Sequence, residues 1–273
     1  MNFIFSLPFM QRALIVAILL AVIIPCIGMI VVLKRLSMTG DALSHTSLAG
    51  VVAGLVWNIN PILSATLFCI AAALGMELIR KKFPKYSEIS VSIILAAGVG
   101  LAAVLSTFVK SSVNIDSFLF GSILTITDFE LYMTVGLSVI VLLTFVVLYK
   151  ELFYITMNER DAVLSGVPVR AVNLIFTLLT AVTVALAART VGALIVSSMM
   201  VLPVASAMQF EKGYKVTLIL SVLFGAVFMV SGLIVAFYLG LKTGGTIILI
   251  GVIVLIVILV VKSVMQSLRR LKR

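Results

Sequence analysis

Long runs of apolar residues, separated by short charged or turn-forming breaks, dominate this chain. Each run approaches the roughly 20 residues that a helix needs to cross the hydrocarbon core of a bilayer. Between the second and third runs, Asn58, Asn60 and Pro61 supply a turn and a helix-opening proline. The pattern predicts an all-α, polytopic transmembrane helical bundle with nine spans, at 13–33, 42–58, 61–79, 89–109, 131–149, 171–188, 190–210, 216–239 and 244–261.

Two places leave the number of spans open. Arg189 allows almost no loop between the sixth and seventh runs, so eight spans with one broken or re-entrant element is the main alternative. A further apolar stretch, 117–127, is too short to cross and is expected to be re-entrant or interfacial. The run from Ala13 to Leu33 is longer than the apolar region of a signal peptide, and we interpret it as the first span.

Composition supports a membrane protein. Of the 273 residues, 63% are hydrophobic and 11% are charged, which is too few charges to cover a water-facing globule. No soluble domain interrupts the runs, so residues 1–273 are expected to form a single transmembrane domain. The two cysteines, Cys26 and Cys69, lie inside apolar runs and predict neither a disulfide nor a metal cluster.

The basic residues predict the topology. With Lys34 and Arg35 placed inside, sixteen of the 20 Lys and Arg residues fall in inside loops and in the basic tail 262–273. The four on the other side are Arg12, Lys110, Arg189 and Lys242. Because cytoplasmic loops are rich in Lys and Arg, the bias predicts N-out, C-in and an odd number of spans.

Asp41 and His45 are the candidate metal ligands. They are four positions apart, so on a helix they lie one turn apart on the same face, and His45 is the only histidine of the chain. A carboxylate and an imidazole form part of a site for a divalent transition metal. Two ligands are too few for a complete site, but a two-fold dimer would supply Asp₂His₂. The alternative is structural, with Asp41 as a helix N-cap and His45 hydrogen-bonded to it.

Other polar and small residues have structural interpretations. Glu77 is expected to pair with Arg80 or Lys81 at the inner end of the third span. The Met199–Met200 pair and the GxxxG motif Gly50–Gly54 are typical of helix packing. Three outer acidic residues are expected to be solvated in loops: Asp116, Asp128 and Glu130.

The inside loop 150–170 mixes charges with a short amphipathic stretch. It predicts a short helix across the cytoplasmic face, and an ordinary polar loop is the alternative. The residues of interest are Glu159, Arg160, Asp161, Gly166 and Pro168.

Several functions lack their motifs. The sequence contains no phosphate-binding GxxxxGK[ST], no HExxH, no GxSxG and no second histidine for acid–base chemistry. The chain is therefore expected to be neither an ATPase nor an enzyme. A transporter of this composition uses an ion gradient or takes its energy from another subunit.

Three blocks of sequence resemble the permeases of bacterial metal-ion ABC importers, the zinc, manganese and iron uptake group. The first covers 9–14, Gly28 and 32–45, and contains Gly-Asp-Ala-Leu-Ser-His. The second is Phe118–Leu124, with Leu-Phe-Gly-Ser. The third combines Asp161, Ala162 and Gly166 with 191–203.

The resemblance implies a homodimeric permease with two cytoplasmic ABC ATPase subunits and an extracytoplasmic binding protein that delivers the metal. It places Asp41 and His45 in a metal-pathway helix, 40–58, and the loop 150–170 at the ATPase. The transported ion is the only metal implied, with no permanent cofactor and no nucleic-acid partner. Relatives often carry an acid where this chain has Ser122, and the pattern at 117–122 is similar to the zinc branch. Zn²⁺ is therefore expected, with Mn²⁺ or Fe²⁺ as alternatives.

Three rivals remain at this stage. A stand-alone, gradient-driven secondary metal transporter would work without an ATPase. A vitamin or siderophore permease would need a wide polar cavity and no Asp–His pair. Metal export is the third, because the direction of transport depends on the binding protein.

Overall fold

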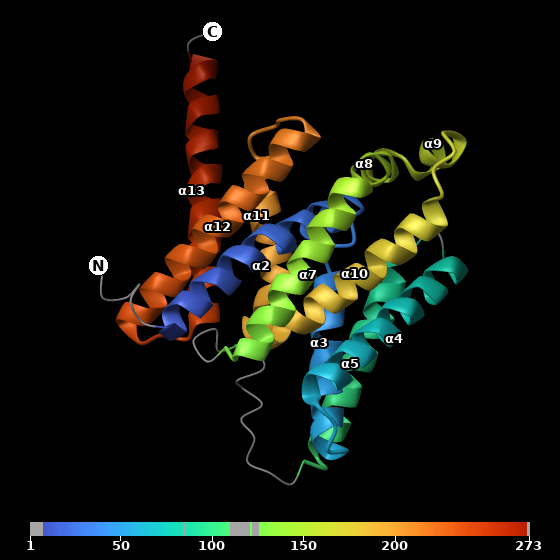
Figure 1. The fold of residues 1–273 in the computed structure, drawn as a ribbon. Helices are drawn as coiled ribbons and strands as arrows, with labels where there is room; N and C mark the ends of the chain where they lie inside the picture. The colour runs from blue at the N-terminus through green and yellow to red at the C-terminus, as the bar shows by residue number, and fades with distance from the viewer. Residues whose placement is uncertain (1–7, 84–85, 110–120, 122–125, 272–273) are drawn as a thin grey trace.

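The computed structural model describes residues 8–83, 86–109, 121 and 126–271. Within these residues every regular element is a helix (Figure 1). The eleven helices are α2 (Pro8–Leu33), α3 (Thr39–Val56), α4 (Pro61–Lys82), α5 (Ser87–Ser106), α7 (Asp128–Val147), α8 (Tyr149–Met157), α9 (Glu159–Leu164), α10 (Val169–Thr190), α11 (Ala193–Met208), α12 (Tyr214–Leu239) and α13 (Thr243–Leu271).

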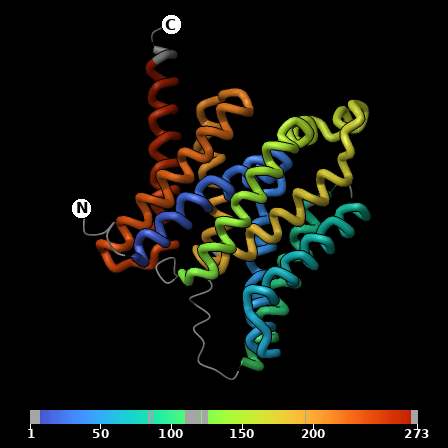
Figure 2. The backbone as a smooth tube through the Cα atoms, in the orientation of Figure 1, coloured from blue at the N-terminus to red at the C-terminus, as the bar shows by residue number. Residues whose placement is uncertain are grey.

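The helices form two connected groups. In one, α2 packs against α11, α12 and α7, and α13 stands at the edge against α12 and α11. In the other, α3 packs between α4 and α5 at the lower right of Figure 1, and α10 joins this group through α4 and α3. In Figure 2 the start of α2 lies beside the α12–α13 turn, and α13 rises from this turn to its end at the top of the view.

The nine predicted runs fall in nine separate helices, but seven of them are long and apolar enough to cross a membrane by length and composition. The other two are α3, which carries Asp41 and His45, and α11, which has 16 residues. The break expected at Arg189 is real, because α10 ends at Thr190 and α11 begins at Ala193. Gly192, with a φ of 111°, makes this two-residue turn possible. Nine crossings, and their direction, stay predictions.

The last helix continues past the predicted end of its membrane span. The sequence places a membrane boundary at 261 and a basic tail over 262–273, whereas α13 runs to Leu271. This stretch contains good helix formers and no Gly or Pro after Gly251, so nothing stops the helix. Lys262 donates hydrogen bonds to Gln209 O at 2.8 Å and to Glu211 Oε1 at 2.6 Å, which fastens α13 to the α11–α12 turn.

Small residues allow helices to approach at the positions the sequence indicated. A Cβ added to Gly50 would lie 2.6 Å from Ala65 Cα, so the GxxxG motif is the contact of α3 with α4, as predicted. Met199 and Met200 are fully buried and pack in the core, also as predicted. A Cβ on Gly28 would lie 2.1 Å from Met200 O, so α2 and α11 meet backbone to backbone.

The interpretation of the outer acids as solvated loop residues is wrong for Glu130. Its side chain is 9% exposed and pairs with Arg189 of α10, with Oε1 3.2 Å from Nε. Glu130 also forms a capping box with Thr127 at the start of α7. Asp128 contacts Arg12 at 2.9 Å but is 62% exposed. Asp116 and residues 117–120 lie outside the described part of the chain.

Replacing Glu130 with Ala is expected to lower the stability of the folded protein by about 2 kcal/mol, because it removes both a helix cap and the largely buried end of the ion pair with Arg189. Asp128→Ala is the matched control and should cost less than about 1 kcal/mol, since its ion pair is exposed. Thermal unfolding of the detergent-solubilised variants measures both. Equal losses in the two variants would contradict the assignment of Glu130 as the stabilising residue.

Candidate metal-ion site

A rigid turn leads into the helix that carries the candidate ligands. Leu36 N donates to Val31 O at 2.9 Å and Arg35 N donates to Val32 O at 2.9 Å, which is the Schellman pattern at the end of α2. Arg35 occupies the left-handed position of this motif with a φ of 58°. Thr39 N then donates to Leu36 O at 2.9 Å, so α3 starts directly from the turn.

Asp41 and His45 lie on one face of α3, with 3.8 Å between His45 Nε2 and Asp41 Oδ1. The N-cap residue is Met38, which makes no side-chain cap, and Asp41 stands inside the first turn. Asp41 is therefore not the N-cap that the structural alternative assumed. Its carboxylate is still favourable there because the first turn carries the positive end of the helix dipole.

The pair lies on the one open stripe of a buried helix. From Thr39 to Gly54, every residue of α3 is buried except Asp41, His45 and Leu48, which are partly exposed. These three positions follow helical spacing and share one face. The side chains of Asp41 and His45 are 28% and 26% exposed. A carboxylate and an imidazole on such a face cannot rest against lipid tails without a large cost in free energy.

One copy of the chain offers an incomplete metal site. Among the described residues, no group of three or more His, Cys, Asp and Glu side chains comes together. Both cysteines are buried, and the Cys69 thiol donates to Leu43 O at 3.3 Å. The donors available at this face are thus one carboxylate and one imidazole, which can hold a divalent cation if further ligands come from another surface or from water.

The segment 150–170, predicted to be an inside loop, contains the short helix α9 and most of the short helix α8. Asn158 caps α9, accepting from Arg160 N at 3.0 Å and donating from Nδ2 to Asp161 Oδ2 at 2.8 Å. Gly166, with a φ of 80°, ends the helix, and Pro168 precedes α10. Two apolar side chains of α9 face outward, and Leu164 is 86% exposed.

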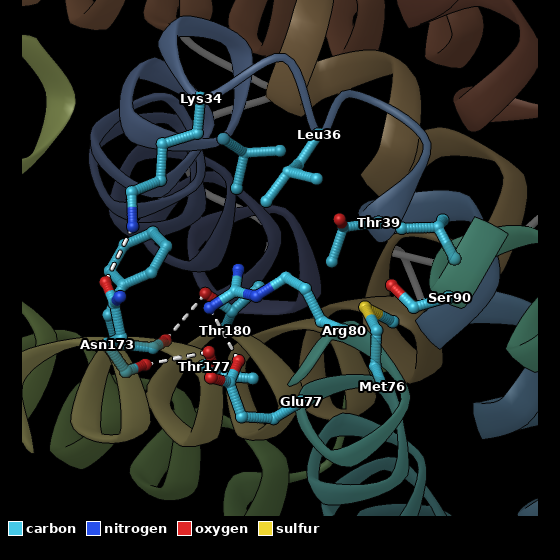
Figure 3. Close-up of a pocket in the computed structure, with 13 residues that line it drawn as sticks. Lys34, Leu36, Thr39, Met76, Glu77, Arg80, Ser90, Asn173, Thr177 and Thr180 are labelled. Carbon is cyan, nitrogen blue, oxygen red and sulfur yellow. Dashed lines mark hydrogen bonds and ion pairs between the residues drawn. The ribbon is translucent and has the colours of Figure 1, made fainter. Parts of the chain in front are cut away.

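A small cavity of about 30 Å³, lined by both apolar and polar side chains, lies between the end of α2, the start of α3, α4, α5 and α10 (Figure 3). A wider vestibule of about 550 Å³, lined in part by α8 and Glu159, shares Lys34, Glu77 and Asn173 with it. Glu77 pairs with Arg80 at 2.7 Å, as predicted. No sequence signal pointed to the contact of Lys34 Nζ, which donates to Asn173 Oδ1 at 2.6 Å. The two residues are 139 positions apart, and no local pattern marks such a contact.

The chain matches the model of the ABC 3 transport family over residues 6–262. A protein of Treponema pallidum named "Probable metal transport system membrane protein" is 33% identical, with 94% of this chain and 96% of that protein covered. The manganese transport system membrane protein MntC of Listeria innocua is 30% identical over 90% of this chain and 88% of its own length.

The fold also matches a solved complex. The structure of PsaBC from Streptococcus pneumoniae with Fab has a chain of 26% identity and a TM-score of 0.83, with 94% of this chain and 93% of that chain covered. These matches extend over nearly the whole sequence. The chain therefore belongs to the ABC 3 transport family, and it is a multi-pass plasma-membrane permease subunit of a metal-ion ABC importer, not an enzyme.

Proposed function

We propose that this permease carries Mn²⁺ along a pathway in which Asp41 and His45 of each copy bind the ion directly. The observation that carries the proposal is the exposed stripe of α3. A carboxylate and an imidazole on the open stripe of an otherwise buried helix need a polar partner surface or a water-filled path. Family membership removes the stand-alone carrier and the exporter from the alternatives.

A second copy of the chain is the proposed source of the missing ligands. Two copies related by a two-fold axis that runs beside α3 would place two Asp41–His45 pairs opposite each other. Leu48, one turn further along the same stripe, would then pack in the same interface. The pathway helix of the proposal is thus residues 40–58, of which α3 forms the helical part.

Release of the ion and the named relatives favour manganese over the zinc preference that the 117–122 pattern suggested. The carboxylate suits Mn²⁺, the imidazole also suits Zn²⁺, and no thiolate, a further ligand that favours Zn²⁺, is available at this face. A transported ion must also leave its site, and Mn²⁺ binds N and O ligands more weakly than Zn²⁺ does. The manganese named for the Listeria relative points the same way, and zinc is named for none of the relatives described above.

The segment 150–170 is the proposed contact with the cytoplasmic ATPase. Glu159, Arg160 and Asp161 give α9 a charged first turn, and Leu164 supplies an exposed apolar side chain. Gly166 and Pro168 fix the turn that connects α9 to α10. A polar helix with an apolar tip, in a loop outside the spans, suits docking to a soluble subunit. On the opposite side, an extracytoplasmic binding protein would deliver the ion.

Uptake of radiolabelled metal tests this function. The permease is reconstituted into liposomes with its ATPase and binding protein, and Mn²⁺ and Zn²⁺ are supplied at equal free concentrations. We expect ATP-dependent Mn²⁺ uptake to exceed Zn²⁺ uptake by about ten-fold, because the ligand set releases Mn²⁺ more readily. Faster uptake of Zn²⁺ would restore the zinc assignment, and uptake without ATP would contradict the importer mechanism.

A further inference from the structure

The geometry points to Lys34 and Asn173 as positioning residues that join the ATPase-contacting helix α9 to the metal-bearing helix α3; this inference rests on the proposed function. Lys34 Nζ donates to Asn173 Oδ1 at 2.6 Å, and Asn173 Nδ2 donates to Glu159 Oε1 at 3.2 Å. These three residues, called the relay below, connect the end of α2, the start of α10 and the first residue of α9.

At one end, the relay is fixed to α3. Lys34 lies in the Schellman turn at the end of α2, and Leu36 of this turn packs against the hydrophobic core. Thr39 and Ala42 of α3 donate backbone hydrogen bonds to Leu36 and Met38 of the same turn, at 2.9 and 3.0 Å. A displacement of Lys34 therefore moves the first turn of α3, where Asp41 stands.

At the other end, the relay is fixed to the segment that contacts the ATPase. Glu159 is the first residue of α9, and Asn158 caps that helix. Asn173 is 5% exposed and stands in the second turn of α10, which continues from α9 through Gly166 and Pro168. An asparagine suits the middle position because its amide oxygen accepts from the ammonium while its amide NH₂ donates to the carboxylate.

Lys34 occupies its position at a cost in stability. Burial and, to a smaller extent, the charge of Arg80 lower the pKa of Lys34 to about 8, although Glu159 and Glu77 act in the opposite direction. Lys34 is partly buried, so an apolar side chain could pack there, and a structural role alone does not require an ammonium group that donates to Asn173.

Movement of α9 could also reach α3 through apolar packing, because α10 contacts α3 and α4 directly. The number of Mn²⁺ ions taken up per ATP hydrolysed separates the two routes in the reconstituted complex. We expect Lys34→Met to lower this ratio by about ten-fold while complex formation, thermal stability and ATP hydrolysis persist. Lys34→Arg should restore most of the ratio, since it keeps the charge and the donor. Lys81→Met, in the same vestibule but outside the relay, is the matched control.

Variants of the middle residue provide the second test. Asn173→Leu should lower the ratio to the level of Lys34→Met. The double variant should have the same ratio as either single variant, because each single substitution already interrupts the relay. Asn173→Asp keeps the acceptor for Lys34 but places a second carboxylate beside Glu159. It should also lower the number of Mn²⁺ ions taken up per ATP hydrolysed. Three results would overturn the relay. They are a ratio for Lys34→Met within two-fold of wild type, losses that multiply in the double variant, and loss of the assembled complex.

The same measurements keep the relay separate from the proposed metal. If the wild-type complex transports Zn²⁺ in place of Mn²⁺, the manganese assignment fails. The relay is then tested by the number of Zn²⁺ ions taken up per ATP hydrolysed. If Asp41→Ala transports normally while Lys34→Met is uncoupled, the site assignment fails and the relay stands. If ATP drives the uptake of neither ion, both proposals fall.

Discussion

Asp41→Ala and His45→Ala are each expected to lower ATP-dependent metal uptake by at least about 100-fold. Replacing a residue that merely orients a metal ligand typically costs 10- to 100-fold, and a direct ligand costs at least as much. Each copy offers only these two donors at the open stripe of α3, so one substitution removes half of what that copy contributes. Uptake of radiolabelled Mn²⁺ into proteoliposomes, normalised to the amount of assembled complex, measures the loss.

The matched control for these variants lies on the same helix. Thr46 is buried, and its hydroxyl donates to Ala42 O at 2.8 Å within α3, away from the exposed stripe. Thr46→Val keeps the shape of the side chain, so uptake should stay within about two-fold of wild type. Asp41→Asn separates charge from shape and should resemble Asp41→Ala. Normal uptake in both alanine variants would remove Asp41 and His45 from the pathway.

Gly28→Ala is expected to lower the apparent unfolding temperature by about 10 °C, which corresponds to about 3 kcal/mol for a chain of this size. The added methyl group would meet Met200 O at 2.1 Å and Met200 Cα at 2.9 Å. Backbone atoms of two packed helices cannot move aside as a flexible side chain can, so α2 and α11 must separate. This contact also supports the end of α2 from which the turn to α3 begins.

Unfolding can be followed with a thiol-reactive fluorescent dye, because Cys26 and Cys69 are both buried and become accessible only as the protein opens. Gly100→Ala is the control, since nothing lies within 4 Å of a Cβ added there on α5. It should leave the unfolding temperature unchanged or raise it slightly, because alanine favours helix over glycine by up to about 1 kcal/mol. A Gly28→Ala variant as stable as Gly100→Ala would contradict the close contact of α2 with α11.

Local pattern predicted most of the helices. Apolar run length, Pro61 at a helix start and charges at the ends gave the positions of the helices, including the break after Arg189. Local pattern also indicated the close helix packing at Gly50–Gly54 and the Glu77–Arg80 ion pair, because both motifs consist of residues a few positions apart. It gave the wrong environment for Glu130 and did not indicate that α13 continues to Leu271. The Glu130–Arg189 pair joins α7 to α10, and the Lys262–Glu211 pair joins α13 to the α11–α12 turn, in both cases between segments distant in the sequence.

The sequence by itself determined that this is a helical membrane protein and that Asp41 and His45 share a helix face, since both follow from the period of a helix and the thickness of a bilayer. Only the tertiary structure decided that this face is the open stripe of α3, because burial depends on how α4, α5, α10 and α11 surround it. It alone brought Lys34, Asn173 and Glu159 into one hydrogen-bonded chain. Side-chain contacts across such separations arise from helix packing, which no local pattern contains.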